Sequence, residues 1–165
     1  FRAAERTFSL LTQVIGRAGR AEAGGTAVIQ TYAPKNETIR LACLQDYEKF
    51  YEGEIAIRRE LSYPPFCDLV QLSLISEDER ALSEYGKKLS ASILDKLSGE
   101  YAHLPFTVFG PFEAQVYKVN EKYRLRMVVK CKLNRESRGF FHKLLIEAAS
   151  EKAVSLSIDL NPLTV

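Results

Sequence analysis

The sequence predicts a mixed α/β protein, and two observations on the spacing of its apolar residues carry that prediction. Stretches in which apolar and polar residues alternate, as in half-buried strands, are separated by stretches with apolar residues three and four positions apart, as in helices. After residue 62 these stretches follow the order strand, helix, strand, strand, helix, strand, which is the order of a split βαβ unit. We therefore expect a ferredoxin-like sandwich in the second part of the chain.

The first part is predicted to hold two long helices with one strand between them. Residues 1–21 contain helix formers and no proline, and Thr26–Tyr32 is rich in the β-branched and aromatic residues that favour strands. Asn36 is a suitable N-cap for a helix over Glu37–Leu61. The pair Pro64-Pro65 cannot continue that helix, because each proline disfavours the helical conformation of the residue before it. We expect a domain boundary at these prolines, dividing the chain into 1–62 and 63–165.

The six elements of the second part are predicted from alternation, caps and turn residues. In order they are a strand around Val70–Leu74, a helix capped by Ser76 and ended by Gly99, strands over Phe106–Tyr117 and Tyr123–Lys132, a helix from Asn134 to Ser150, and a strand over Ala153–Leu160. The Gly110-Pro111 pair predicts a bulge or bend in the second strand. The last helix is expected to face the core with Phe141, Leu144, Leu145 and Ala148.

Composition bounds the class of protein. The chain of 165 residues is 46% hydrophobic and 27% charged, which predicts a folded core and no global disorder. No apolar run approaches the ~20 residues of a membrane-spanning helix, so we expect a cytoplasmic protein without a membrane partner. The formal net charge of +2 does not by itself imply nucleic-acid binding. The first residue is Phe1 and the single methionine is Met127, so we expect the chain to be part of a longer protein.

The cysteines predict neither a disulfide framework nor a metal site. Cys43, Cys67 and Cys131 form no C-x-x-C pair, and their odd number does not suit paired disulfides. The two histidines lie far from any close pair of cysteines, so no four-ligand zinc site is expected. We expect three reduced thiols, with Cys131 packed in a strand, Cys43 in a helix and Cys67 near a loop. A catalytic thiol would need a base nearby, and the sequence shows none.

The sharpest chemical signal is the stretch from Gln13 to Arg20, which has the form Q-x-x-G-R-x-G-R. It resembles motif VI of superfamily-two helicases. Arg17 and Arg20 are three apart and so share a helical face, with Gln13 four residues before Arg17 on that face. Planar guanidinium groups suit the charge that develops on the γ-phosphoryl oxygens of ATP during hydrolysis. The alternative is that the motif is an ordinary basic helix end in contact with solvent. That alternative explains Arg20 well, but it does not explain two glycines, Gly16 and Gly19, inside a helix.

Further motifs along the chain stand in an order that is specific for one family. They are Phe1–Phe8, Val28–Tyr32, Tyr63–Phe66, Phe109–Pro111 and Ile158–Pro162. With the arginine motif they resemble the C-terminal part of the primosomal protein N′ family of bacterial replication-restart DNA helicases, over essentially the whole chain. The resemblance implies that 1–62 ends the second RecA-like helicase lobe with its exit helix, and that 63–165 is the family's C-terminal domain. It implies an ATP-dependent 3′-to-5′ helicase that binds branched DNA at stalled forks and assembles the primosome.

Several helicase motifs are absent from this sequence, and their absence determines which cofactors we expect the chain to bind. It contains no G-x-x-x-x-G-K-[ST] phosphate loop, no Mg²⁺-holding D-E-x-H-type motif and no clustered cysteines. The resemblance therefore implies ATP and Mg²⁺ in the parent protein, with Gln13, Gly16, Arg17 and Arg20 as the ATP-binding residues contributed here. It places zinc in the parent, outside this part. We expect this chain alone to bind none of these cofactors and not to hydrolyse ATP.

A strongly basic stretch predicts a surface for DNA. From Lys118 to Lys143 there are nine basic residues and two acidic ones. Because side chains alternate along a strand, Arg124, Arg126, Lys130 and Lys132 are expected on the open face of the sheet, with Tyr117 and Phe109 nearby. A row of cations with aromatic rings suits DNA, branched or single-stranded. An ordinary solvated face is the alternative.

The resemblance also implies protein partners. The family binds the acidic, aromatic-ended tail of the single-stranded-DNA-binding protein, besides other primosome proteins. Arg135 and Arg138, on one face at the start of the last helix, are the expected tail-binding residues, with Phe140 or the stem of Lys143 lining a slot. Two other functions remain open at this point: a stand-alone nucleic-acid-binding module of ferredoxin-like fold without an ATPase role, and a purely structural docking domain.

Overall fold

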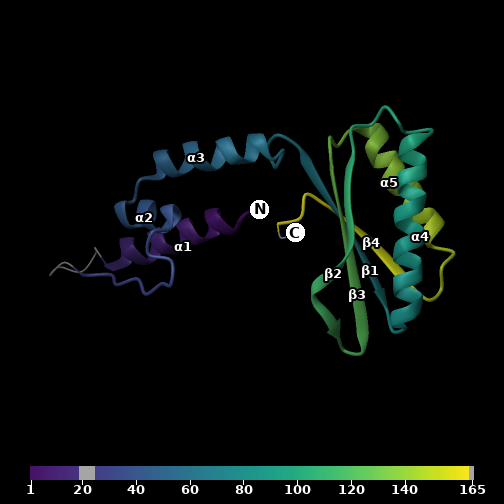
Figure 1. Cartoon of the computed structure of the whole chain (residues 1–165), viewed down its shortest axis with the longest axis horizontal. Coiled ribbons are helices and arrows are strands. Elements are labelled where there is room, and N and C mark those ends of the chain that lie inside the picture. The colour runs from purple at the N-terminus through teal and green to yellow at the C-terminus, as the bar shows by residue number, and fades with distance from the viewer. Residues whose placement is uncertain (19–24, 164–165) are drawn as a thin grey trace. The chain divides into compact units, whose positions relative to one another are not determined.

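The computed structural model describes residues 1–18 and 25–163 (Figure 1). Over these residues the chain has five helices and one four-stranded antiparallel sheet, so the predicted mixed α/β class is confirmed. The chain divides into two compact units, Phe1–Leu61 and Ser62–Val165. No helix in the described part is long and apolar enough to cross a membrane.

The first unit is helical in its described residues. It contains α1 (Ala3–Ala18), α2 (Glu37–Leu44) and α3 (Tyr47–Glu60). Its core is small and partly aromatic, because the ring of Phe8 on α1 stacks on that of Phe50 on α3 with centroids 4.2 Å apart. Burying these rings is what joins the first helix to the third, since short helices gain most of their stability from packing.

Two predictions for this unit are wrong. The single helix over Glu37–Leu61 is divided in two, because Gln45 adopts a left-handed conformation with φ of 53° and Asp46 starts a new helix as its N-cap. The predicted strand over Thr26–Tyr32 is absent: these residues carry no strand, and the side chains of Val28 and Tyr32 are exposed. A strand needs a neighbour for its backbone groups, and the described residues of this unit supply none.

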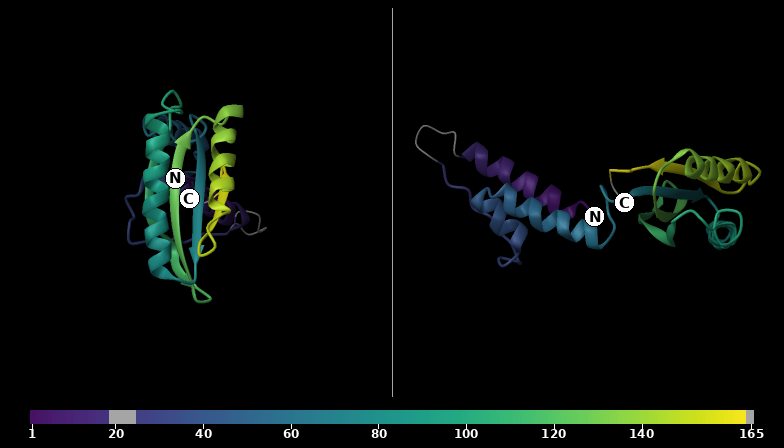
Figure 2. Two further views of the ribbon diagram at one scale, coloured as in Figure 1. Left: turned by 90° about the vertical axis from the view of Figure 1, so that its right-hand side faces the viewer. Right: turned by 90° about the horizontal axis from the view of Figure 1, so that it is seen from above.

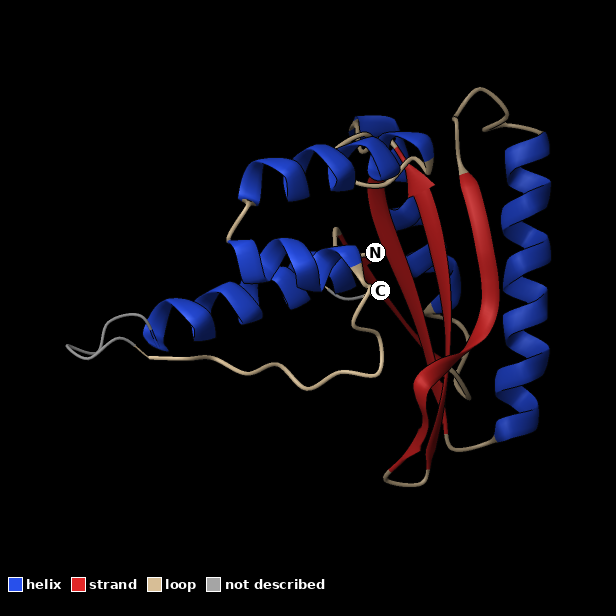
Figure 3. Ribbon diagram, turned by 60° about the vertical axis from the view of Figure 1, so that its left-hand side comes forward, coloured by secondary structure: helices blue, strands red, loops and turns tan. Residues whose placement is uncertain are grey.

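The second unit is built on a sheet of β1 (Asp68–Ser76), β2 (Thr107–Val119), β3 (Lys122–Cys131) and β4 (Ser155–Leu160). The strand order is β2-β3-β1-β4, and every neighbouring pair is antiparallel (Figure 3, strands in red). Two helices, α4 (Glu79–Ser98) and α5 (Arg135–Ala148), pack on the same face of this sheet (Figure 2). The opposite face therefore has no helix of this unit upon it.

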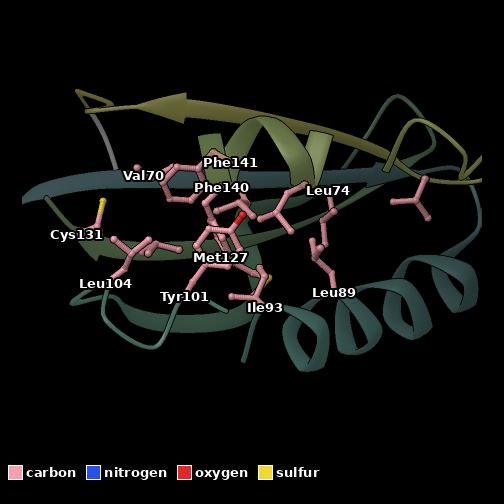
Figure 4. Packing of buried hydrophobic residues seen from close by; sticks show 14 of the residues in the cluster. Val70, Leu74, Leu89, Ile93, Tyr101, Leu104, Met127, Cys131, Phe140 and Phe141 are labelled. Atoms are coloured by element: carbon pink, nitrogen blue, oxygen red, sulfur yellow. The ribbon is translucent and has the colours of Figure 1, made fainter. Parts of the chain in front are cut away.

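The core of this unit lies between the sheet and the two helices (Figure 4). Val70, Leu72 and Leu74 of β1 are fully buried there, as their alternation predicts. On α5 the prediction needs one correction. Phe140 is 1% exposed and packs edge-on against Tyr101, whereas Leu145 is 38% exposed and does not face the core. The helix is rotated from the expected orientation because the aromatic cluster takes two adjacent phenylalanines, Phe140 and Phe141.

Helix caps match the sequence in three of four cases, and Asn36 is the N-cap of α2 as predicted. Asn134 caps α5 and forms a reciprocal capping box with Ser137, and Gly99 is the C-cap of α4. The N-cap of α4 is Asp78 and not Ser76: the Asp78 carboxylate accepts from the backbone of Arg80 and Ala81. Ser76 ends β1 and donates its hydroxyl to the carbonyl of Ala153 at 2.7 Å, because it is buried and needs a partner there.

Candidate nucleic-acid interface

The arginine motif begins in the last turns of α1. Gln13 and Arg17 are both exposed and lie one turn apart on the same face of that helix. A Cβ added at Gly16 would meet nothing within 4 Å, so packing among the described residues does not require a glycine at this position. Gly19 and Arg20 lie outside the described residues. The structure thus presents the amide of Gln13 and the guanidinium of Arg17 on one accessible surface.

A groove with a volume of about 650 Å³ runs between α1 and α3 beside this surface. Its lining includes Gln13 together with the aromatic residues Phe8, Tyr47 and Tyr51, but not Arg17. At its other end Arg58 donates to Glu5 at 2.8 Å and to Glu54 at 2.8 Å. The hydrogen bond from Arg58 holds the pKa of Glu5 below its usual value. The lining thus carries two carboxylates against one guanidinium, and these three groups pair with one another, while Phe8, Tyr47, Phe50 and Tyr51 give the groove an aromatic surface.

The basic row of β3 lies on the face of the sheet away from the helices. Met127, Val129 and Cys131 are buried under the helices, and the alternate residues Arg124 and Arg126 are half-buried on the other face. Lys132 follows the end of the strand and is exposed. Strand alternation thus places the two arginines of β3 side by side, two positions apart, on the open face.

Lys130 shares this face but is engaged by aromatic rings. Its Nζ atom lies 3.8 Å from the ring centroid of Tyr63 and 5.5 Å from that of Phe109. Cations attract the negative faces of aromatic rings at such distances. Phe109 therefore lies beside the basic row as expected, whereas Tyr117 does not lie there. Its hydroxyl donates to Glu79 of α4 at 3.0 Å, so the expectation of Tyr117 beside the basic row is wrong.

Several cations of the basic stretch are paired locally. Lys118 binds Glu121 at 2.6 Å, Lys122 lies 3.6 Å from Glu77, and Lys143 binds Glu100 at 3.0 Å. Arg124 and Arg126 differ from these lysines, because the Nε atom of each is buried and has no hydrogen-bond partner among the described residues. A buried donor without a hydrogen-bond partner lowers the stability of the folded protein. Binding of an anion at these two arginines would remove that cost, so they are the strongest candidates for an anion site.

Arg124 and Arg126 line a groove with a volume of about 410 Å³ on the open face. The lining also includes Ala114–Val116 of β2, on one side of β3, and Gln71 and Ser73 of β1, on the other side. The described residues that line this groove include no Asp or Glu. Neutral hydrogen-bonding groups and two cations suit an anionic ligand. Sequence alternation predicts the arginines, but the groove depends on an irregular course of β2 that alternation cannot reveal.

The start of α5 offers a second basic surface. Arg135 and Arg138 are exposed there. The capping box already occupies one helix-start N–H, since Ser137 N donates to Asn134 Oδ1 at 2.8 Å. Phe140 is buried, so it cannot line a surface slot, and that part of the sequence prediction is wrong. Lys143 lies with its Nζ 5.2 Å from the Tyr101 ring centroid, which leaves its stem as the remaining apolar candidate.

The thiols take the predicted places, with Cys131 buried in β3, Cys43 exposed on α2 and Cys67 half-buried near a loop. Burial raises the pKa of Cys131 to about 12, so this thiol stays protonated. Among the described residues no group of three or more His, Cys, Asp or Glu side chains could hold a metal ion.

Comparison with known proteins shows the family to which this chain belongs. Residues 59–163 match the family model of the primosomal protein N C-terminal domain. The chain is 39% identical over 165 residues to replication restart protein PriA of Bacillus subtilis (strain 168), covering 98% of this chain and 20% of the relative. It is 33% identical to the protein of the same name from Synechocystis sp., covering 100% of this chain and 19% of the relative. The chain thus spans about a fifth of the length of these relatives.

Proposed function

Because the chain belongs to the family of the primosomal protein N C-terminal domain, we propose that it is the C-terminal part of an ATP-dependent DNA helicase that restarts stalled replication forks and assembles the primosome. In this proposal 1–62 completes the second RecA-like lobe and its exit helix, and 63–165 is a ferredoxin-like DNA-binding domain. The strand order β2-β3-β1-β4, with a helix before β2 and another before β4, supports the ferredoxin-like assignment.

The observation that carries the ATP-related role is the shared helical face of Gln13 and Arg17, at the spacing of the helicase motif. Arg17 and Arg20 stabilise the charge on the γ-phosphoryl oxygens of ATP, and Gln13 couples the nucleotide to the lobe. Gly16 lets the nucleotide or another lobe approach, which fits the open space around its Cα. ATP and Mg²⁺ are held mainly by parts of the parent outside this chain, as is its zinc.

The ATP-related role is tested by Arg17→Ala in the full-length parent protein. DNA-stimulated ATP hydrolysis should fall by roughly 10³-fold, as for lost arginine fingers, while thermal unfolding stays unchanged. Arg40→Ala is the matched control, because that arginine of α2 is exposed and pairs at the surface with its helical neighbour Glu37. Near-normal turnover in the Arg17 variant would remove it from the nucleotide site.

The DNA-binding role rests on the open face with Arg124, Arg126 and Lys130 and on Lys132 beside it. Contacts to phosphates release counterions, so binding of the 165-residue chain to a single strand should weaken with salt, at a slope of about −0.7 per phosphate contacted. The reversals Arg126→Glu and Lys130→Glu should weaken binding to all sequences about equally. Affinity that does not change with salt would rule out the electrostatic role. Salt-sensitive binding together with a normal ATPase in Arg17 variants would instead favour the stand-alone nucleic-acid-binding module.

The tail of the single-stranded-DNA-binding protein is the proposed protein partner of the surface at Arg135 and Arg138. Both side chains are exposed at the first turns of α5, next to the exposed Lys132. Carboxylates of an acidic tail would find three cations within one short segment. Other primosome proteins are further proposed partners of the parent, without an assigned surface in this chain.

A further inference from the structure

The open face carries two exposed phenylalanines that a regular strand could not place together. Phe109 lies opposite Val128 and Phe112 opposite Arg126, so β2 advances by three residues where β3 advances by two. Residues three apart on a regular strand point to opposite faces. The extra residue restores Phe112 to the face of Phe109, and both rings remain accessible, at 39% and 49% exposed.

Gly110 makes this bulge possible. Its φ is +102°, a conformation that side chains rarely adopt, and an added Cβ would lie 2.9 Å from the carbonyl oxygen of Arg126. The position therefore requires glycine for two independent reasons. The bulge that aligns the two rings is built into the backbone and does not depend on how the surface side chains happen to pack.

A second, larger irregularity forms the wall of the arginine groove. Between the pairs Glu113–Leu125 and Lys118–Tyr123, β2 advances by five residues while β3 advances by two. The three additional residues take β2 out of register, and Ala114–Val116 of this segment line the groove with Arg124 and Arg126. Phe112, directly opposite Arg126, stands next to the groove. Aromatic rings and anion-seeking cations are thus neighbours on one surface.

The spacing of these groups discriminates between single strands and duplexes. Two residues that are two positions apart on a strand are separated by about 6.6–6.8 Å. This is the spacing of Val128 and Arg126, the residues of β3 opposite the two phenylalanines. It is also the spacing of Arg124 and Arg126 along β3. Successive bases in duplex DNA are roughly 3.4 Å apart and are stacked on one another, so their faces are closed to protein rings. The two phenylalanine rings are spaced at about twice the distance between stacked bases. Each ring can therefore stack on a base only where the bases of the strand have moved apart.

We propose that this surface selects single-stranded DNA, with Phe109 and Phe112 stacking on two separated bases while Arg124 and Arg126 bind phosphates in the groove. The proposal rests on the DNA-binding function proposed above and specifies its ligand. Stacking accepts any base, so the surface selects strandedness and not sequence. Lys130 has a supporting role, because its ammonium group lies against the rings of Tyr63 and Phe109.

The test uses the 165-residue chain and three probes: a single-stranded DNA 12-mer with a central 2-aminopurine, the same 12-mer as a duplex, and the corresponding RNA. We expect the single strand to bind at least 10-fold more tightly than the duplex, with a change in 2-aminopurine fluorescence on stacking. Phe112→Ala should weaken binding of the single strand by about 10-fold and abolish that change, whereas Phe112→Tyr should preserve both.

Leu94→Ala is the matched control, since Leu94 is an exposed apolar residue at 55% on α4, a helix of the opposite face. Urea unfolding of each variant separates loss of binding from loss of fold. Equal affinity for the duplex, tighter binding of the RNA, or a Phe112→Ala variant that binds normally would overturn the inference while leaving DNA binding intact. Failure of the folded chain to bind any of the probes at low salt would overturn the proposed DNA-binding function itself.

Discussion

Asn161 and Asp68, 93 residues apart in the sequence, are joined by a hydrogen bond of 2.9 Å from Nδ2 of Asn161 to Oδ1 of Asp68. The other carboxylate oxygen of Asp68 accepts from the backbone N–H of Leu133 at 2.8 Å. Asn161 also accepts from Leu69 N through its side-chain oxygen at 3.0 Å and donates its own N–H to Leu69 O at 2.7 Å. One asparagine thus ties the end of β4 to the start of β1, beside the end of β3.

Asn161→Ala should therefore lower the free energy of unfolding by about 2 kcal/mol, because two side-chain hydrogen bonds contribute roughly 1 kcal/mol each. Asn161 also has a positive φ of 54°, which alanine tolerates less well. Asn120→Ala isolates that second effect, since Asn120 has a φ of 50° in the turn between β2 and β3. Urea denaturation followed by circular dichroism measures both. Equal losses in the two variants would show that the hydrogen bonds contribute nothing.

Two glycines in this unit should respond oppositely to alanine. Gly110→Ala should destabilise the unit by more than about 1 kcal/mol, because of its positive φ and the clash with the Arg126 carbonyl. Gly139 lies inside α5, and a Cβ there would meet nothing within 4 Å. Gly139→Ala should raise stability by up to about 1 kcal/mol through helix propensity. Thermal unfolding of both variants gives the signs, and a stabilising Gly110→Ala would contradict the bulge geometry.

The ion pairs of Arg58 should make the stability of the first unit depend on pH. The hydrogen bond from Arg58 lowers the pKa of Glu5 below the usual 4.5. A lowered pKa contributes stability that is complete above 4.5 and is lost as the pH falls through the lower, folded value. The stability difference between the native chain and Arg58→Met should accordingly be largest at pH 7 and shrink below about pH 4.5.

The readout for this prediction is thermal unfolding at several pH values between 7 and 3. Arg40→Met is the comparison. Arg40 also lowers the pKa of Glu37, but these two side chains are 54% and 64% exposed, against 14% for Arg58, so solvent screening should make the pH-dependent difference smaller in this variant. A difference between the native chain and Arg58→Met that does not change with pH would mean that Arg58 acts through its packing and not through Glu5.

Tail binding at the start of α5 gives a fourth prediction. Arg135→Ala in the full-length parent should weaken a labelled acidic, aromatic-ended peptide by roughly 10-fold, which corresponds to about 1.4 kcal/mol. Arg80→Ala is the control, because Arg80 is an exposed arginine near the start of α4 that pairs with Glu84. Fluorescence anisotropy titration measures the affinity. Unchanged binding in the Arg135 variant would remove this residue from the site.

The parts of the fold that follow from local spacing could be predicted from the sequence. The order of strands and helices after residue 62 follows from alternation and caps, with Asn134 and Gly99 at the expected helix ends. Ser76 and Asp78 show the limit of such signals. Both are good N-caps, and only the burial of Ser76 against Ala153, a contact distant in sequence, decides that Asp78 caps the helix.

The remaining errors have the same origin in distant contacts. Thr26–Tyr32 has strand-forming composition, but composition cannot supply a partner strand within the described unit. Tyr117 should stand beside the basic row by simple alternation, yet the additional residues of β2 turn it toward Glu79. For the site, alternation predicts the face of Arg124 and Arg126. It cannot predict the groove, which depends on how far β2 departs from the register of β3.

The irregular course of β2 has a further effect, on the colloidal behaviour of the protein. β2 is an edge strand, and it carries the exposed apolar side chains Phe109, Phe112 and Val116. A long, flat, apolar edge invites the strand of another molecule to pair with it. Two departures from register interrupt β2, and Pro111, which lacks an N–H, lies within the first of them, so the strand offers no long straight run of backbone for such pairing. A variant that straightened β2 would be expected to self-associate through this edge.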